Sequence, residues 1–208
     1  LFDYAPTALL AEGFERATLR AFEIGFDRRR KKITFPIRSH LGTLVGISGR
    51  DVLGIGPRYK IYVDELKDAV PGYEFKKGRV LWGLHRFYDD ALNDGLTQPV
   101  VVCEGFKAAM WVYQSGFNNV VALIGASATR EQRHLLGLVG NDVVLFLDND
   151  KAGVGATKKL LEHVDTAYTR VVDYGERGPV SPDDLDSETI NTIVAGAKHP
   201  LLWRLKNV

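Results

Sequence analysis

Two stretches of the sequence decide the fold: PVVVCEGFKA at residues 99–108 and VVLFLDNDKAG at residues 143–153. In each, a run of apolar residues stops abruptly at a carboxylate. This pattern is typical of a buried strand that delivers an acid to the edge of a sheet. The acids are Glu104 after the first run, and Asp148 and Asp150 after the second. If the two strands are neighbours, we expect all three carboxylates at one edge.

Three carboxylates at one edge repel one another, so such a cluster usually binds a divalent cation. Oxygen ligands suit Mg²⁺, which bridges to phosphates in many enzymes. The sequence therefore predicts metal-dependent phosphoryl or nucleotidyl chemistry.

Two features after the second run have more than one interpretation. Asp150 can cap the helix that follows, since Asp is a favoured N-cap residue, and this is compatible with a metal role. Gly153 and Gly155 lie just inside the same predicted helix, where each costs about 1 kcal/mol relative to Ala. They indicate either the close approach of a phosphate or close packing against the sheet.

From residue 98 onward, the apolar pattern alternates between strands and helices. Strands are predicted near residues 100–103, 119–124, 142–147 and 168–173, and helices near residues 106–115, 130–139, 152–164 and 186–196. This alternation predicts a mainly parallel sheet flanked by helices, with its active edge at the carboxyl ends of the strands.

The region before residue 98 has a different pattern. Residues 1–26 have helix-like spacing, residues 33–49 read as a β-hairpin, and residues 51–80 suggest short strands and loops. We therefore predict an α/β protein in two parts. A smaller mixed α+β subdomain, basic in places, spans residues 1–97, and the sheet with the acids and a C-terminal helical segment spans residues 98–208.

Composition narrows the function classes. The net charge of the 208 residues is only +1, but basic residues cluster at 28–32 and again at 76–79. Such local clusters favour a polyanion partner, although the run at 28–32 can also be read as a solvated loop. The single cysteine, Cys103, excludes an internal disulfide and a cysteine-rich zinc site. No segment approaches the about 18 apolar residues of a membrane span, and no signal peptide is visible. We expect a cytoplasmic location without a membrane partner.

The pairing of Glu104-Gly105 with the later DNDKAG resembles a Toprim domain, which bacterial-type primases, topoisomerases and some nucleases share. Other stretches resemble primase motifs in particular, and they follow in the same order along the chain: FPIRSHLGTLVGISGR (35–50), PRYK (57–60), FKKGRVLWGL (75–84), LIGASATREQ (123–132) and SPDDL (181–185). The chain as a whole resembles the Toprim-containing RNA-polymerase domain of a bacterial or phage DnaG-type DNA primase.

This resemblance implies an enzyme, a DNA-directed RNA polymerase of primase type. It would make short RNA primers on a single-stranded DNA template from NTPs, by nucleotidyl transfer with Mg²⁺ or Mn²⁺. Contact with a replicative helicase would need a further domain. The cell would be bacterial or phage-infected. The resemblance also implies site residues: Glu104, Asp148 and Asp150 for catalysis and metal binding, Asp183 as a further metal ligand, and Arg30, Lys32, Arg50, Arg58 and Lys77 for template or nucleotide.

The chain departs from the family pattern at two acids. The pattern has Asp three residues after the Glu-Gly pair, where this chain has Ala108, and Lys107 precedes it. The first Asp of the pattern's D-P-D segment is replaced by Ser181. Fewer carboxylates imply weaker metal binding or fewer metals, unless Asp173 or Asp184 compensates.

Two alternative functions remain at this point. The first is a Toprim nuclease or topoisomerase-type enzyme, against which the motifs before residue 98 argue. The second is a single-stranded nucleic-acid-binding module whose catalysis has lapsed, which Ala108 and Ser181 favour. Binding of Mn²⁺ separates this second alternative from a working primase.

Overall fold

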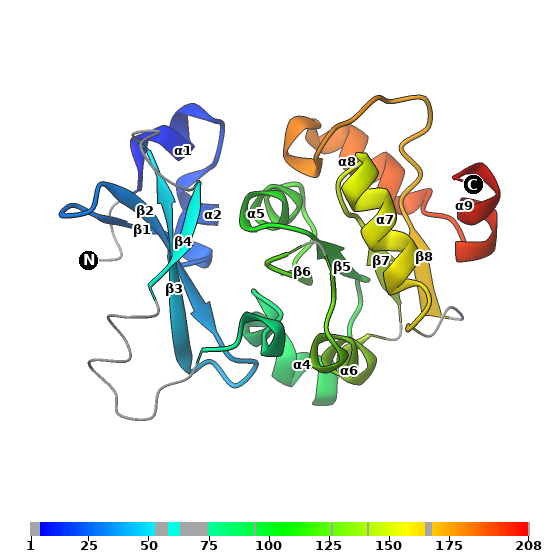
Figure 1. Cartoon of the computed structure of the whole chain (residues 1–208), viewed down its shortest axis with the longest axis horizontal. Coiled ribbons are helices and arrows are strands. Elements are labelled where there is room, and N and C mark those ends of the chain that lie inside the picture. Colours follow the sequence, from blue (N-terminus) through cyan, green and yellow to red (C-terminus); the bar gives the residue numbers. More distant parts are fainter. Residues whose placement is uncertain are drawn as a thin grey trace. The chain divides into compact units, whose positions relative to one another are not determined.

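The computed structural model describes residues 5–52, 58–62, 75–93, 95–125, 127–140, 142–164 and 168–207. The chain divides into two compact units, Leu1–Lys77 and Gly78–Val208 (Figure 1). One unit contains an antiparallel sheet and the other a parallel sheet, so the predicted α/β class is confirmed. The subdomain boundary predicted between residues 97 and 98 stays a prediction.

The first unit is built on a sheet with the strand order β1-β2-β3-β4. Its described elements are α1 (Thr7–Ala11), α2 (Arg16–Ala21), β1 (Gly25–Asp27), β2 (Lys32–Arg38), β3 (Leu44–Asp51) and β4 (Tyr59–Ile61). The helix-like spacing of residues 1–26 thus gives two short helices followed by a strand. Gly13 lies between the helices with a φ of +95°, a conformation that glycine adopts without steric cost.

Strands β2 and β3 form the hairpin that the sequence predicts. Ile33, Phe35 and Ile37 are fully buried and alternate with half-exposed residues, so one face of β2 packs on the core. The turn closes where Ser39 donates its backbone N–H to the carbonyl of Thr43, at 2.8 Å. Gly42 within this turn has a φ of +83°.

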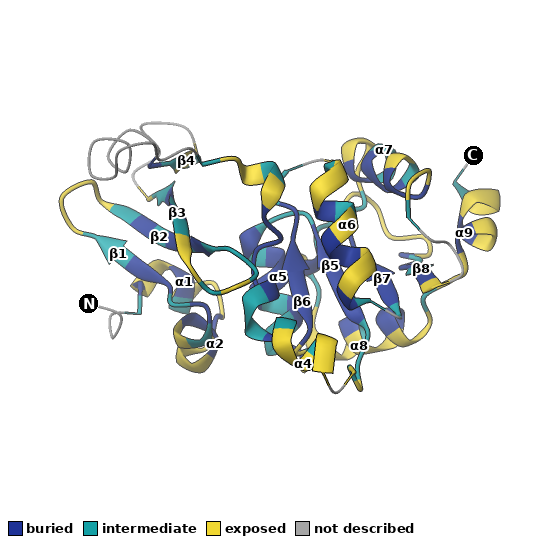
Figure 2. Ribbon diagram, turned by 90° about the horizontal axis from the view of Figure 1, so that it is seen from below, coloured by how far each residue is buried: buried dark blue, intermediate teal, exposed yellow. Residues whose placement is uncertain are grey.

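The second unit is built on a parallel sheet with the strand order β6-β5-β7-β8. The strands are β5 (Val100–Cys103), β6 (Val120–Ala122), β7 (Val143–Leu145) and β8 (Thr169–Val171). All four lie within the predicted strand regions. Every residue of β5 is buried, so both faces of this strand are covered, as in parallel sheets generally (Figure 2).

Helices provide this cover. They are α4 (Tyr88–Asn93), α5 (Phe106–Gln114), α6 (Arg130–Val139), α7 (Lys151–Leu160), α8 (Ser187–Ala195) and α9 (Pro200–Lys206), with short 3-10 turns at η1 (Lys77–Arg79), η2 (Leu84–Arg86) and η4 (Pro182–Asp184). Apolar residues of α6 and α7 join one core cluster with Val100, Val102 and Leu145. Helix α5 packs against β5, β6 and α8. None of the helices within the described ranges is long and apolar enough to cross a membrane.

The strand that leads to the paired aspartates is shorter than predicted. Its ladder ends at Leu145, whereas the apolar run extends to Leu147. Phe146 and Leu147 remain buried all the same, and Phe146 donates its N–H to the carbonyl of Val102 at 2.9 Å. The chain therefore stays beside β5 until Asp148.

Candidate active site

The acid-bearing strands are direct neighbours. β5 pairs with β7 in parallel, with Val100 opposite Val143 and Val102 opposite Leu145. Glu104 follows the last residue of β5, and Asp148 follows the extended continuation of β7. The predicted arrangement, two adjacent parallel strands that bring carboxylates to one sheet edge, is confirmed.

These carboxylates are crowded and partly removed from water. Burial, with the negative charges of Asp148 and Asp150, raises the pKa of Glu104 above its ordinary value. Burial also raises the pKa of Asp148; a hydrogen bond from Ser181 opposes this shift, and the negative charges of Asp183, Asp150 and Asp184 add to it. Both shifts have the same physical origin: negative charge is disfavoured where like charges and low polarity coincide. A bound cation would relieve this.

Asp150 caps a helix. Its Oδ1 accepts the backbone N–H of Gly153 at 2.7 Å, at the start of α7. A Cβ atom on Gly153 would collide with the backbone carbonyl of Asp148, so close packing explains this glycine. A Cβ on Gly155 would meet open space.

Asn149, between the two aspartates, has a structural role that the sequence reasoning missed. Its side-chain amide donates to the carbonyls of Arg177 and Gly178, both at 2.9 Å. Its own backbone N–H donates to the carbonyl of Val180 at 2.8 Å. These three bonds fix the loop that leads to Ser181 against the end of β7. A polar residue between two predicted ligands was the only signal in the sequence.

Asp183 lies on this loop, in η4, and has a cationic partner. Lys107 Nζ is 2.9 Å from Asp183 Oδ2, and each side chain is only 17% exposed. Nearby, Ser181 donates a hydrogen bond to Asp148, and its backbone N–H donates to the carboxylate of Asp184 at 2.8 Å. The loop thus brings Asp183 close enough to affect Asp148 while its own charge is balanced by Lys107.

The two proposed substitutes for the missing acids differ. Asp173 is bound by Lys206, with 2.7 Å between Nζ and Oδ2, and this bond lowers the pKa of Asp173. Asp184, although occupied by the loop backbone, still acts on Asp148 through its charge. Asp184 is therefore the better candidate to compensate for Ser181.

The donor set fits a hard divalent cation, because it consists of carboxylate oxygens whose mutual repulsion a cation would cancel. Within the described parts of the chain, however, no three His, Cys, Asp or Glu side chains are gathered as metal ligands. Asp150 accepts the N–H of Gly153, and Asp183 is paired with Lys107. Binding of one cation by three of these acids would therefore require their side chains to move closer together.

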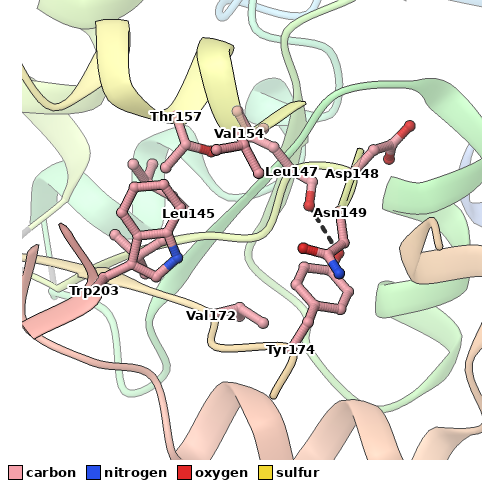
Figure 3. Close-up of a pocket in the computed structure, with 10 residues that line it drawn as sticks. Leu145, Leu147, Asp148, Asn149, Val154, Thr157, Val172, Tyr174 and Trp203 are labelled. Carbon is pink, nitrogen blue, oxygen red and sulfur yellow. Dashed lines mark hydrogen bonds between the residues drawn. The ribbon is translucent and has the colours of Figure 1, made fainter. Parts of the chain in front are cut away.

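The cavity beside Asp148 is not a substrate pocket. Its volume is about 10 Å³, which is room for a single water molecule at most. Figure 3 shows the Tyr174 ring on one side, with its hydroxyl donating to the Leu147 carbonyl at 2.7 Å, while the Asp148 carboxylate points away from the Trp203 side of the cavity. The Asp148 carboxylate is therefore available for contacts outside this small cavity.

The predicted DNA- and nucleotide-binding residues all belong to the first unit, and two of them are paired there. Arg30 lies 3.1 Å from Asp27, and its guanidinium is 5.0 Å from the centroid of the Tyr62 ring. Arg50 on β3 lies 3.0 Å from Glu12. Their roles toward nucleic acid stay predictions.

The other three basic residues are placed as follows. Lys32 begins β2, where the strand register sets it between Asp27 and Asp51. Arg58 is exposed just before β4, and Lys77 is exposed at the start of η1. The residue before Arg58 in the PRYK stretch, Pro57, lies outside the described residues.

Two of the motif stretches bind each other within the second unit. The Thr129 hydroxyl donates to the carbonyl of Gly78, and Thr129 also caps α6. The Gln132 side chain donates to the carbonyls of Val80 and Leu123, at 2.8 and 2.9 Å. These residues of FKKGRVLWGL and LIGASATREQ therefore support the sheet edge.

The sequence is similar to those of known proteins. Residues 101–184, from β5 through Asp184, match the family described as Toprim-like. The DNA primase of Deinococcus radiodurans is 38% identical over 149 residues, 70% of this chain and 24% of the relative. The DNA primase of Escherichia coli K12 is 31% identical over 166 residues, 79% of this chain and 26% of the relative.

Solved structures agree on the fold. The DnaG catalytic core superposes with a TM-score of 0.74 at 24% identity, covering 92% of this chain and 72% of the other. The zinc-binding and RNA-polymerase domains of the Aquifex aeolicus primase superpose with a TM-score of 0.73 at 19% identity, covering 92% and 55%. This chain has a DnaG-type primase core fold. The resemblance seen in the motifs is thereby confirmed.

The chain spans about a quarter of the length of the curated primases it matches, at 24% and 26% for the two above. The matched primases are bacterial in both cases, so a phage origin stays a prediction.

Proposed function

We propose that this chain is part of a DNA primase core and catalyses template-directed synthesis of short RNA primers on single-stranded DNA. The observation that carries the proposal is the crowding of Glu104 and Asp148 at the ends of two adjacent parallel strands. Sequence similarity to bacterial DNA primases supports it. A solved structure of similar fold is described as the DnaG primase catalytic domain bound to ssDNA.

The proposed reaction joins two nucleotides. The 3′-hydroxyl of one attacks the α-phosphate of an incoming NTP, and pyrophosphate leaves. Mg²⁺ or Mn²⁺, when bound by Asp148 and Asp150 with Glu104 or Asp183, would reduce the charge barrier and orient the triphosphate. The raised pKa of Glu104 suits a second role, acceptance of the proton that the hydroxyl loses. Both roles for Glu104 are compatible with its position.

The partners follow from the same proposal. The template is single-stranded DNA, the substrates are NTPs and the product is an RNA primer. Arg30, Lys32, Arg50, Arg58 and Lys77 are the proposed contacts to template or nucleotide. A replicative helicase would be contacted through another domain. The activity assigns the protein to the cytoplasm of a bacterial or phage-infected cell.

Primer synthesis by the purified chain tests the proposal directly. Labelled NTPs, single-stranded DNA and Mg²⁺ or Mn²⁺ are supplied, and short labelled products are measured on gels. We expect Asp148→Asn to reduce the rate at least about 100-fold, since a cation's charge stabilisation contributes several kcal/mol. Asp90→Asn, the same change on an exposed residue of α4, is the matched control and should retain the rate. Equal rates in the wild type and Asp148→Asn would contradict the proposal.

A second candidate function is a lapsed module that binds single-stranded DNA without catalysis. It is favoured by Ala108, by Ser181 and by the lack of three gathered metal ligands among the described residues. Mn²⁺ titration separates the two candidates. A lapsed module binds DNA with an affinity that Mn²⁺ and Asp148→Asn leave unchanged, whereas a working core binds Mn²⁺ and loses it in this variant.

A further inference from the structure

Lys107 lies in an unusual position for a lysine. It is in the first turn of α5, three residues after Glu104, where the helix dipole disfavours positive charge. Its side chain is nevertheless 83% covered and lies 2.9 Å from the carboxylate of Asp183. Such a placement is stable only if a nearby negative charge compensates, and Asp183 supplies that charge.

The loop that carries Asp183 is fixed along the same helix. Trp111 donates its indole N–H to the carbonyl of Leu185 at 2.7 Å. Further along α5, the hydroxyls of Ser115 and Ser187 are 3.1 Å apart, and Asn191 donates to the carbonyl of Ser115 at 3.0 Å. The contact of Lys107 with Asp183 is therefore one end of a row of bonds between α5 and residues 183–191. It does not depend on a freely moving surface side chain.

The residue after Lys107 also differs from the family pattern. The family pattern has a carboxylate at residue 108, where this chain has a buried alanine. The sheet edge thus lacks one negative charge of the pattern and contains a positive charge one residue earlier. Asp183, one of the acids expected to bind metal, faces that positive charge.

We infer that Lys107 is a built-in cation of this site, which neutralises Asp183 and removes it from the ligands available to divalent metal. The inference rests on the proposed function and refines it. Glu104, Asp148 and Asp150 remain as the metal-binding acids, so the site binds fewer divalent cations than the full set of acids would. Lys107 acts on metal binding through Asp183 and is a positioning residue.

The test is a titration of the full chain with Mn²⁺, without nucleotide or DNA. Electron paramagnetic resonance measures how much Mn²⁺ is bound at each step. Lys107→Met removes the charge and keeps the length of the side chain. We expect it to bind one additional Mn²⁺, or to bind Mn²⁺ about tenfold more tightly, as removal of a nearby unit charge predicts. Lys107→Arg keeps the charge and should titrate like the wild type.

The double variant Lys107→Met with Asp183→Asn decides the mechanism. If Lys107 acts through Asp183, this variant loses the gain and returns to the wild-type titration. A gain that persists without Asp183, or no gain in Lys107→Met, would overturn the inference. If Lys107→Met does not fold, as judged by circular dichroism, Lys107→Gln is used, since its amide can still donate to Asp183.

The same titration separates this inference from the proposed function. Mn²⁺ bound by the wild type and lost in Asp148→Asn supports the proposed site whatever Lys107 does. Equal Mn²⁺ binding by the wild type and Lys107→Met then overturns the role of Lys107 alone. No binding by either protein overturns both.

Discussion

Three arginines of the first unit and two acids at the sheet edge of the second unit have opposite electrostatic surroundings. In the first unit, Arg30, Arg38 and Arg50 each lie close to a carboxylate, at 3.1, 2.6 and 3.0 Å. In the second, Glu104 and Asp148 lie among like charges that raise the pKa of both. Paired charges support a fold, whereas charges held together against their repulsion mark a site that awaits a ligand. On this criterion the acids of the second unit are the stronger functional assignment.

The largest effect on the acid edge is expected from Gly153→Ala. A methyl group there would collide with the Asp148 backbone, and a backbone atom cannot give way as the end of a flexible side chain can. We expect a loss of about 3 kcal/mol in the free energy of unfolding, at the upper end for overpacking, and a matching loss of activity. Urea unfolding measures the first and primer synthesis the second.

Gly155→Ala is the matched control, two residues further along the same helix. Its methyl group would enter open space, so we expect a gain of about 0.5–1 kcal/mol from helix propensity. Equal destabilisation by the two substitutions would show that Asp148 is not held by the close approach of Gly153. That result would undermine the contrast between the paired charges of the first unit and the crowded acids of the second, because the crowding depends on the position of the Asp148 backbone.

The opposite pKa shifts predict opposite effects of pH on stability. For Glu104 and Asp148, with raised pKa, stability is greatest below their ordinary values of 4.5 and 3.8 and falls as the pH rises through the raised values. For Asp27, burial acts to raise the pKa, but hydrogen bonds and the charge of Arg30 outweigh it, so the pKa is lowered. Its contribution is therefore present above 3.8 and is lost as the pH falls.

Single variants sharpen this contrast. At pH 7 we expect Asp148→Asn to be more stable than the wild type, by about 1 kcal/mol after allowance for its partial exposure, and Asp27→Asn to be less stable. Chemical unfolding across the pH range measures both. If Asp148→Asn destabilised the protein at pH 7, the acids would be structural after all, and the distinction between the units would fail.

The smallest effect is expected from releasing Arg50. Glu12→Gln removes its partner, and if Arg50 contacts nucleic acid, single-stranded DNA should bind about two- to fivefold more tightly at low salt. Glu15→Gln removes the same charge from an exposed residue nearby and serves as the control. Fluorescence anisotropy with labelled DNA measures both affinities. An equal gain in the two variants would indicate only a change in net charge.

The sheet could be predicted because its strands are short, fully apolar runs bounded by turn residues. VVVC at residues 100–103 and VVLFL at residues 143–147 have no competing interpretation as surface segments, and the acids after them follow by position. The pairing of β5 with β7 was an expectation from the acids themselves, and the structure confirms it.

Contacts between distant residues could not be predicted in the same way. Lys107 and Asp183 are 76 residues apart, and Arg50 and Glu12 are 38 apart, so nothing in the local pattern pairs them. Helix α9 received no predicted bounds of its own within the expected C-terminal helical segment, because seven residues are too few for periodicity to be read. Local sequence patterns therefore gave the positions of the acids but not the charges that face them.

The bonds of Asn149 set a limit on how loop length can vary. They attach the carbonyls of Arg177, Gly178 and Val180 to the end of β7. Residues inserted before Arg177 would bulge outward and leave these attachments intact. One residue inserted after Val180 would shift Asp183 along α5, away from Lys107. The two halves of one short loop are thus under different constraints: length is free on one side of the attachment and fixed on the other.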